Sequence, residues 1–364
     1  MNILMISGDR EIMKEGSPVR LRMEEYAALT THLSILILNG KGNVYEGDKL
    51  SLYPAPYPIK YLAPFKAISL GEKIIKNKPI DVITTQDPFE TGLVGYTLSL
   101  KYKKPLHVQV HTDVGSSYFQ KSHYLNSVRL MIAKKVIPHA KAIRAVSDRV
   151  KKGILENFAP TCSVSVLPIM VPEKKYEEVE KQTYPYPFTV LLLGRLEKEK
   201  RYENAIRVLS ALHRRYPAVG LLIVGKGGEE GRLRSMAQRL GVLDRVTFMK
   251  WTDDIGSVLR MSHMLLVTSG YEGYGRVFLE ATDAGVPIVT TRVGIIDDVL
   301  KGGDSVLSCN VDDTACMGGH IMKLLNENYI RRELVIHARA EIKAHRETYQ
   351  DYPKKFIDDI KRAI

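Results

Sequence analysis

MLLVTSGYEGYGRVFLE, at residues 264–280, joins an apolar run to a glycine-bearing loop and then to a helical pattern. The run at 264–268 has the length and composition of a buried parallel strand. Gly273 and Gly275 allow backbone amides to approach a ligand, and the helix expected from Arg276 points its free N–H groups at the same place. The stretch therefore predicts an α/β sheet with an anion-binding loop at the carboxyl end of a strand.

One carboxylate lies in this loop and a second lies in the helix that follows it. Glu272 lies in the loop itself, and Glu280 lies about one turn inside the expected helix. One carboxylate can accept hydrogen bonds from the hydroxyls of a sugar, and the other can accept them from a ribose. The pair suggests a sugar-nucleotide site, although a lone Glu is more often a solvated surface residue.

A second motif follows another buried strand. Residues 189–193 are apolar, and GRLEKEK at 194–200 comes directly after them. Ligands of open α/β sheets bind at the carboxyl edge, which is where Arg195 and Lys200 are expected. A guanidinium and an ammonium there suit a diphosphate and would stabilise a nucleoside diphosphate as it leaves. The alternative interpretation is a basic helix start in a charged loop.

Three stretches of the second half carry a family resemblance: GRLEKEK at 194–200, LLIVGKGGEEGRLRSMAQRLGVLDRVTFMKW at 221–251 and EGYGRVFLEATDAGVPIVTTRVG at 272–294. They resemble the donor half of retaining GT-B glycosyltransferases, specifically glycosyltransferase family 4, or group 1. The resemblance implies an α/β GT-B fold, in which two Rossmann-like domains face a cleft and a C-terminal helix crosses back to the first domain.

The resemblance also implies roles for individual residues. In that family the residues matching Arg195 and Lys200 hold the donor diphosphate, the one matching Glu272 contacts the transferred sugar, and the one matching Glu280 holds the ribose. The other positions expected to line the donor site are Gly16, Gly194, Gly225, Lys226, Trp251, Gly273, Tyr274, Gly275, Arg276 and Val277.

Two residues depart from the family pattern. Arg201 stands where the family usually has glycine after the lysine, which predicts an altered loop shape. Lys250 stands where a glycine often precedes the aromatic residue, here Trp251, so this departure bears on the nucleobase. Arg276 occupies a variable position, from which it can read an anionic donor or add charge at the diphosphate.

The chain is long enough for two domains, since 364 residues give each of them its own core. Apolar runs alternate with helical stretches, as in parallel sheets flanked by helices. We expect strands at 2–6, 33–38, 82–85, 106–111, 142–146, 189–193, 220–224, 246–249, 264–268 and 287–291, and helices at about 19–31, 65–77, 91–102 and 122–136.

A charged, proline-bearing stretch marks the boundary between the two halves. We expect an acceptor-binding Rossmann-like domain at 1–172 and a linker at 173–187. A nucleotide-sugar donor domain should follow at 188–345. The resemblance adds a C-terminal helix at 346–364 that packs on the first domain.

Histidines alternate along the predicted strand at 106–111. His107 and His111 share one face, but only His111 stands at the carboxyl end of the strand, where ligands bind. The family often carries a histidine at this edge near the donor sugar, so we assign His111 to the catalytic set and His107 to the structure. The alternative for His111 is a neutral imidazole that satisfies backbone groups.

No metal or other cofactor is expected, apart from the nucleotide-sugar co-substrate. The sequence holds no Asp-x-Asp pair of the kind that carries Mg²⁺ or Mn²⁺ in glycosyltransferases of the other main fold. Phosphate charge would then be met by Arg195, Lys200 and helix termini. The three cysteines, Cys162, Cys309 and Cys316, are odd in number and lack C-x-x-C spacing. We therefore expect neither a disulfide framework nor a zinc site, and a reducing compartment.

The positive charge is concentrated in the first half. Residues 1–175 hold 25 Lys and Arg against 15 Asp and Glu, whereas residues 176–364 hold 28 against 26. This excess suits an anionic membrane surface or a phosphate-bearing, lipid-linked acceptor. The stretch 118–136 adds apolar residues at helical spacing beside basic ones, as in an interfacial helix, although an ordinary core-facing helix with a basic outer surface is the favoured interpretation. Nucleic acid is not expected as a partner, because no nucleic-acid motif accompanies the charge.

Together these features predict a retaining, metal-independent glycosyltransferase. It would transfer a hexose-type sugar from a UDP- or GDP-sugar to an acceptor hydroxyl, such as that of a lipid-linked or cell-envelope glycan. The rivals are a sugar-nucleotide epimerase of GT-B architecture and a non-catalytic sugar-nucleotide-binding protein. No signal peptide or membrane span is evident, so we expect a cytoplasmic location, with the inner face of the membrane as a candidate docking place.

Overall fold

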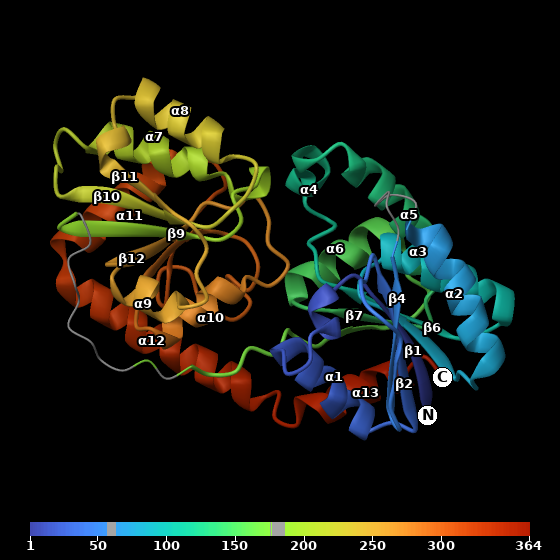
Figure 1. The fold of residues 1–364 in the computed structure, drawn as a ribbon. Coiled ribbons are helices and arrows are strands. Elements are labelled where there is room, and N and C mark those ends of the chain that lie inside the picture. The colour runs from blue at the N-terminus through green and yellow to red at the C-terminus, as the bar shows by residue number, and fades with distance from the viewer. Residues whose placement is uncertain (57–62, 175, 177–185) are drawn as a thin grey trace. The chain divides into compact units, whose positions relative to one another are not determined.

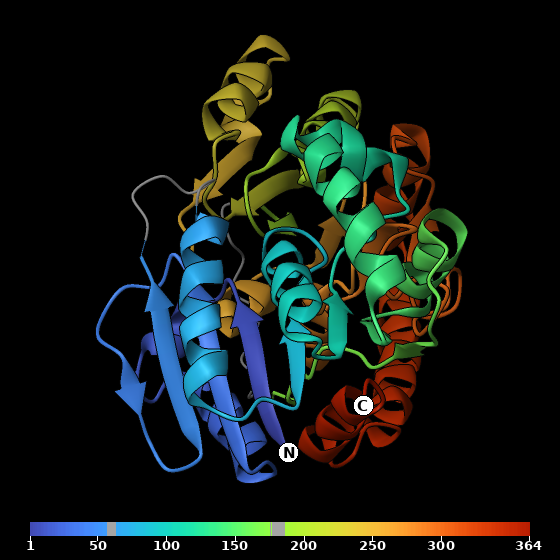
Figure 2. The same cartoon turned by 90° about the vertical axis from the view of Figure 1, so that its right-hand side faces the viewer.

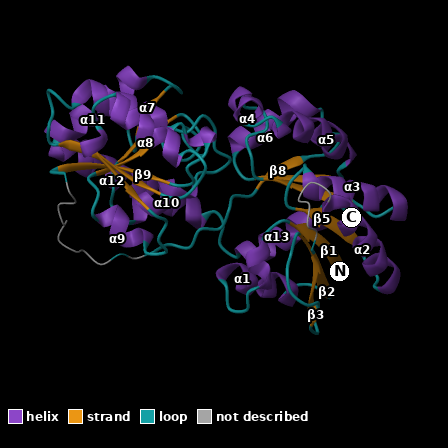
Figure 3. Cartoon of the chain, turned by 45° about the horizontal axis from the view of Figure 1, so that its top comes forward, coloured by secondary structure: helices purple, strands orange, loops and turns teal. Residues whose placement is uncertain are grey.

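The computed structural model describes residues 1–56, 63–174, 176 and 186–364. The chain forms two compact units, one of Met1–Pro168 with Tyr349–Ile364 and one of Ile169–Thr348. Each unit has a sheet of mainly parallel strands covered by helices, which is the predicted α/β class. Figure 3 shows strands in orange and helices in purple within each unit. The linker expected at 173–187 lies largely outside the described residues.

The sheet of the first unit has the strand order β3-β4-β2-β1-β5-β6-β7-β8. All pairings are parallel except that of β3 with β4. The strands are β1 (Asn2–Ser7), β2 (His32–Leu38), β3 (Tyr45–Glu46), β4 (Leu50–Ala55), β5 (Val82–Thr85), β6 (Leu106–Val110), β7 (Ala142–Ala145) and β8 (Val164–Val166).

Helices cover both faces of this sheet. They are α1 (Pro18–Ala28), α2 (Ala63–Asn77), α3 (Glu90–Tyr102), α4 (Ser117–Ser122), α5 (Leu125–His139), α6 (Asp148–Phe158) and α13 (Tyr352–Lys361), with a short 3-10 turn at Arg10–Met13. α1 and α13 pack on one face through a shared apolar cluster, and α2 and α3 lie in front of the strands in Figure 2. The helix predicted at about 122–136 is present as α5, but it begins only at Leu125, because His123 adopts an extended conformation that separates α4 from α5.

Helix α13 is tied to the first unit by apolar packing and by a buried polar network. The rings of Phe356 and Tyr26 stack with centroids 4.4 Å apart. Asp359 accepts hydrogen bonds from His107 Nε2 (2.9 Å) and Ser165 Oγ (2.5 Å). Burial alone would raise the pKa of Asp359, but hydrogen bonds from His107, Ser165 and Arg362 lower it to about 2. The aspartate is therefore ionised. His107 is fully buried, with its ring nitrogens hydrogen-bonded to Thr84 and Asp359, which supports the structural role given to it.

The sheet of the second unit is parallel throughout, in the order β11-β10-β9-β12-β13-β14. Its strands are β9 (Phe188–Leu193), β10 (Val219–Val224), β11 (Val246–Met249), β12 (Met264–Val267), β13 (Ile288–Thr291) and β14 (Leu307–Cys309). The order reverses between β9 and β12. Such a switch point is where ligands bind in open α/β sheets.

The helices of this unit also form two layers, as Figure 1 shows for α7 and α8 on one side and α9 and α10 on the other. α7, α8 and α11 share the main apolar core with the strands. The helices are α7 (Tyr202–Leu212), α8 (Glu230–Arg239), α9 (Ile255–Arg260), α10 (Arg276–Asp283), α11 (Thr314–Asn326) and α12 (Asn328–Glu347), with 3-10 turns at Lys198–Lys200 and Leu243–Arg245.

The predicted strands are confirmed to within one residue at each end, but β3, β4, β8 and β14 were not predicted. β3, β8 and β14 are two or three residues long and lie at sheet edges. β4 carries Pro54, which argues against a strand interior. It lies beside the edge, where β3 pairs only with Ser51 and Leu52. None of the helices in the described parts of the chain has both the length and the apolar character that crossing a bilayer requires.

The network around Asp359 predicts a large difference between two adjacent aspartates. Asp359→Ala should lower the free energy of unfolding of the first unit by about 3–5 kcal/mol, since it leaves buried donors without their partner. Asp358→Ala is the control: Asp358 is half exposed and, among the described residues, forms an ion pair with Lys361 alone, so its loss should cost less than about 1 kcal/mol. Urea unfolding combined with amide hydrogen exchange of α13 measures both. Equal effects would contradict the role of the network.

Candidate functional site

The loops that follow β9 and β12 meet at the switch point of the second sheet. Lys200 Nζ lies 2.6 Å from Glu272 Oε1. The hydroxyl of Thr268 donates to the Lys200 carbonyl (2.6 Å), and the Gly270 N–H donates to the Glu199 carbonyl (2.8 Å). Two residues selected separately from the sequence, 72 positions apart, are thus in direct contact.

The Lys200–Glu272 pair is mostly shielded from solvent. Each side chain is only 16% exposed, and Ser269 Oγ donates a further hydrogen bond to Glu272 (2.7 Å). Charge-assisted hydrogen bonds are strong when water is largely excluded. The pair holds an ammonium and a carboxylate in fixed positions, the first able to meet a phosphate and the second able to accept from a sugar hydroxyl.

Arg195 is at the same edge but makes a different contact. Its guanidinium is 74% exposed and pairs with Glu199 at 2.8 Å. An exposed pair of this kind contributes little to stability. The structure therefore does not bring Arg195 into the Lys200–Glu272 contact, and the side chain keeps the freedom to turn toward an anion.

Glycines allow the neighbouring loops to touch through their backbones. Gly194 and Gly225 follow β9 and β10 with φ of +149° and +159°. A Cβ on Gly225 would lie 1.8 Å from the Gly194 carbonyl oxygen, and one on Gly227 would lie 2.3 Å from the Leu196 carbonyl oxygen. Gly225 is therefore required for the packing of the two loops.

The start of α10 has the form predicted for an anion site. Gly275 is its N-cap, with φ +84°, and supplies no capping side chain. The first N–H groups of the helix are thus left for another acceptor. Arg276 is exposed and Val277 is half-buried. Glu280 lies on the next turn, 3.8 Å from Arg276, and burial raises the pKa of its carboxyl group while Arg276 and Lys174 oppose that rise.

The loop at 273–275 is fixed by contacts with residues that were not predicted from the sequence. Tyr274 is buried, and its hydroxyl lies 3.0 Å from His345 Nε2. Its carbonyl accepts from the Ile295 N–H. A Cβ on Gly294 (φ +60°) would lie 2.5 Å from that carbonyl oxygen. Tyr274 therefore anchors the loop with its side chain, so only its backbone can serve a ligand in this conformation.

Arg201, which stands where the family usually has glycine, adopts a backbone conformation that glycine favours. Its φ is +50°. Its guanidinium donates to Asp312 Oδ1 (2.7 Å), and Asn204 Nδ2 donates to the same oxygen (2.8 Å). Asn204 and Asp312 were missed, because a contact between loops distant in sequence leaves no spacing signal. The ion pair holds the turn that directly follows Lys200.

A buried hydroxyl also lies beside this turn. A Cβ on Gly194 would lie 3.1 Å from Tyr202 Oη. Within the described residues this hydroxyl has no hydrogen-bond partner, and burial raises its pKa, with Glu272 and Glu199 adding to the rise. A side chain at position 194 would therefore crowd the Tyr202 hydroxyl.

The remaining donor-site candidates lie at the carboxyl edge without contacting the Lys200–Glu272 pair. Lys226 follows β10 and is exposed, with its carbonyl accepting from the Leu196 N–H. Trp251 follows β11 and is 44% exposed. Lys250, the second departure, is exposed beside it. An open aromatic face at this edge is available for stacking.

Two candidates belong to the first unit. His111 follows β6, and its Nε2 lies 3.3 Å from Gln109 Oε1. Burial, together with Arg144 and Arg22, lowers the pKa of His111 to about 3, so the imidazole is neutral at pH 7. It can therefore donate or accept a hydrogen bond but does not carry a positive charge. Gly16 has φ +71° and immediately precedes the Ser17 cap of α1.

Asp87, at the carboxyl end of β5, was missed. Burial raises the pKa of its carboxyl group to about 6, and Glu90 adds to the rise. Its Oδ1 accepts from the Phe89 N–H (2.7 Å) and, more distantly, from the Thr91 N–H (3.3 Å) at the start of α3. The Asp-Pro dipeptide after an apolar strand was the available signal.

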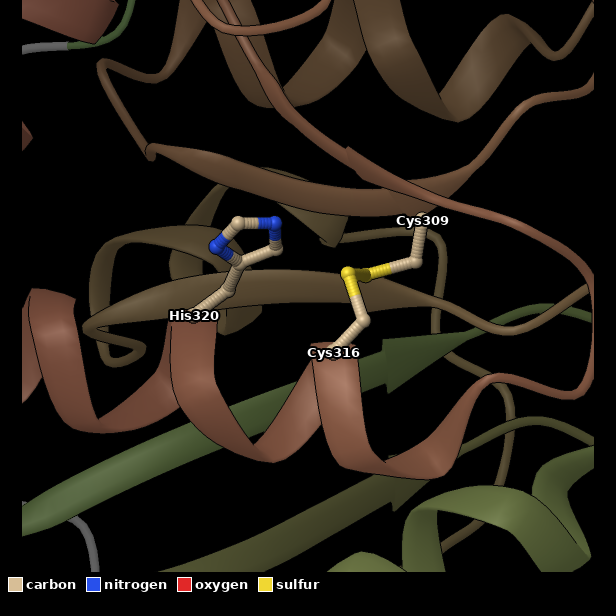
Figure 4. Close-up of side chains that lie close together, drawn as sticks. All are labelled: Cys309, Cys316 and His320. Carbon is tan, nitrogen blue, oxygen red and sulfur yellow. A yellow bond between two sulfur atoms is a disulfide. The ribbon is translucent and has the colours of Figure 1, made fainter.

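The expectation of no disulfide is wrong. Cys309 and Cys316 are joined by a disulfide, with their Cα atoms 5.9 Å apart. Figure 4 shows the bond between the end of β14 and the first turn of α11. The seven-residue separation is not a recognised motif, but the chain reverses direction between the two residues and brings them together. Cys162 is free.

Two family models match consecutive stretches of the chain. Glycosyltransferase Family 4 matches residues 23–174, and Glycosyl transferases group 1 matches residues 174–341. The chain belongs to the family 4, group 1 glycosyltransferases. Lys200 and Glu272 both lie within residues 174–341, the stretch that the group 1 model matches.

Similar proteins support the family and the fold. The N-acetyl-alpha-D-glucosaminyl L-malate synthase of Bacillus anthracis is 31% identical over 150 residues, which are 41% of this chain and 39% of that protein. The chain thus spans well under half of that relative. The sucrose-phosphate synthase structure from Thermosynechococcus elongatus has a TM-score of 0.81 at 18% identity, covering 98% of this chain and 99% of the other. Anabaena HepE in complex with UDP-glucose has a TM-score of 0.71 at 17% identity, covering 98% and 99%. These likenesses confirm the two-domain GT-B fold.

The contact between Gly225 and Gly194 predicts a sharp difference between two glycines of one loop. Gly225→Ala should destabilise the second unit by about 1–3 kcal/mol or more, because its Cβ would meet a backbone oxygen. Gly228→Ala is the control, since a Cβ there meets nothing within 4 Å, and it should change stability by less than about 0.5 kcal/mol. Thermal unfolding of both variants tests this. A Gly225→Ala protein as stable as Gly228→Ala would contradict the packing.

Proposed function

We propose that this glycosyltransferase transfers a hexose-type sugar, with retention of configuration and without a metal, from a nucleoside-diphosphate donor to an acceptor hydroxyl. The observation that carries the proposal is the shielded contact of Lys200 with Glu272 at the switch point of the second sheet. It juxtaposes a cation for the leaving diphosphate with an acceptor for the sugar hydroxyls.

Each group then has a distinct role in the transfer. Lys200 exchanges its carboxylate partner for a phosphate oxygen, and Arg195 turns in from solvent to the same diphosphate. Both cations stabilise the negative charge that develops as the bond to the sugar breaks. Glu272 orients the sugar, Glu280 accepts from the ribose, and the open N–H groups of α10 bind the diphosphate. The acceptor attacks on the face from which the diphosphate leaves, and a departing phosphate oxygen takes its proton.

A uridine diphosphate donor is the first choice for study. Among the structures of similar fold, that of Anabaena HepE holds UDP-glucose, and that of Staphylococcus aureus TarM holds UDP together with a GlcNAc-glycerol compound. Trp251 offers an exposed ring at the carboxyl edge of β11, where a base can stack. Family membership favours transfer over the epimerase and the binding-only alternatives.

The donor assignment is tested with UDP-, GDP- and ADP-sugars in the presence of a chelator. One base series should raise the melting temperature and release free nucleoside diphosphate slowly. Lys200→Gln should reduce that release by about 100-fold or more, because it removes a cation from the leaving group. Lys198→Gln, at an exposed position of the same turn, is the control and should stay within about twofold of wild type.

Three outcomes would contradict parts of this proposal. Release by Lys200→Gln at the rate of Lys198→Gln would overturn the diphosphate assignment. Release that requires added Mg²⁺ would overturn the metal independence. Interconversion of sugar nucleotides without sugar transfer to an acceptor would favour the epimerase alternative.

We propose that the acceptor is a lipid-linked or cell-envelope glycan, presented at an anionic membrane surface. On α5 and at its cap, Tyr124, Val128 and Met131 are 75%, 46% and 60% exposed. They recur at helical spacing, while Val136 and Ile137 on the same helix face the core. Lys121, Lys134 and Lys135 are exposed nearby. Apolar anchors beside lysines suit the headgroup region of an anionic bilayer.

Vesicle sedimentation tests this surface. The protein should sediment with phosphatidylglycerol vesicles at low salt and not with phosphatidylcholine vesicles. Replacing Val128 and Met131 with Ser should weaken that binding, whereas Leu155→Ser, which removes an equally exposed apolar residue from α6, should not. Equal loss in both variants would count against α5 as the docking face.

A further inference from the structure

Three side chains of the kinds that ligate metals gather at the edge strand of the second sheet, and none of them is among the residues assigned to the donor. Cys309 ends β14, Cys316 is the third residue of α11, and His320 lies one turn further along the same helix. The two sulfurs and one ring nitrogen of His320 all lie within 4.8 Å of one another. Figure 4 shows the imidazole beside the sulfur of Cys316.

We propose that the reduced protein binds one zinc ion through Cys309, Cys316 and His320, and that the disulfide is the oxidised form of the same site. Thiolate and imidazole are the ligands that zinc prefers, and tetrahedral sites with three protein ligands leave the fourth position to water. The i and i+4 spacing of Cys316 and His320 puts both on one face of α11. Cys309 approaches that face from the neighbouring strand.

The surroundings of the three residues resemble those of ligands held in place. The ring of His320 is hydrogen-bonded to the Ser308 backbone carbonyl. Ligating histidines usually make such a bond through the nitrogen that does not face the metal, which fixes the tautomer. The Cys316 N–H is capped by Asp313 Oδ1 at 2.9 Å. A thiolate at this position, in the first turn of α11, is favoured by the helix dipole.

The disulfide and the zinc-bound form cannot exist in one molecule at the same time. Zinc is ligated by thiolates, and the sulfurs of a disulfide are not thiolates, so the disulfide must be reduced first. With a phosphine as reductant, the S–S bond breaks, two thiols form, and the phosphine takes oxygen from water. Zinc then binds two thiolates and one neutral imidazole, and the two thiol protons leave to solvent.

Metal titration of the whole protein tests the site. The protein is reduced with a phosphine under nitrogen, freed of reductant and titrated with Co²⁺, which reports thiolate ligands by an intense near-ultraviolet charge-transfer band. One equivalent should bind and be displaced by Zn²⁺. Native mass spectrometry should then show one zinc per chain with loss of the thiol protons. The oxidised wild-type protein, with an identical sequence, should show no band.

Variants locate the ligands. Loss of a residue that only supports a metal ligand typically weakens metal binding by roughly 10–100-fold. Cys316→Ser and His320→Ala each remove a ligand itself, so each should weaken zinc binding by at least that much. Cys162→Ser is the control, because it removes the free thiol of the other unit and should bind as wild type. Absence of the cobalt band in the reduced wild type would overturn the proposal, as would unchanged binding in His320→Ala. Circular dichroism shows whether a variant that binds zinc weakly is still folded. The comparison of oxidised with reduced wild-type protein tests the site without any substitution.

Discussion

The parallel pairing of β9 with β12 is the constraint on which the donor site depends. The two strands are 70 residues or more apart in the chain, yet they are hydrogen-bonded neighbours through Met264 with Val190 and Leu265 with Leu191. The chain leaves β9 toward one side of the sheet and returns at β12 on the other, so no crossover helix covers the point between them. The loops after both strands therefore meet there, and the ion pair of Lys200 with Glu272 is the result.

The charged groups of the site rest on a backbone that only glycine permits. Gly225 lets one loop touch another, and Gly294 lets the loop after β13 support Tyr274 from behind. Flexible side chains at the front, such as Arg195, contrast with this rigid backing. A site of this construction holds its orienting groups in place while its exposed cation stays free to follow a ligand.

The sequence predicted what depends on local pattern. Apolar runs located the long strands, and Lys200, Glu272 and the N-cap Gly275 were selected from their positions after strands or before a helix. Contacts between distant loops could not be predicted, because they leave no periodic signal in one chain. Arg201 with Asp312 is of this kind. Cys309 and Cys316 are only seven residues apart, but their bond also depends on how the chain turns after β14, which no local pattern specifies. Short edge strands and the break at His123 were missed because two or three residues carry too little pattern to outweigh their neighbours.

The position of α13 has a consequence for the order of events during synthesis. The second unit is one continuous stretch, Ile169–Thr348, and can complete its fold as soon as it leaves the ribosome. The first unit cannot, because Tyr26 and His107 find their partners Phe356 and Asp359 only after residues 169–348 have been made. At roughly 5–20 residues per second, the intervening 180 residues impose a wait on the order of ten seconds or more. During that interval the apolar face that α13 covers in the finished unit lacks that helix.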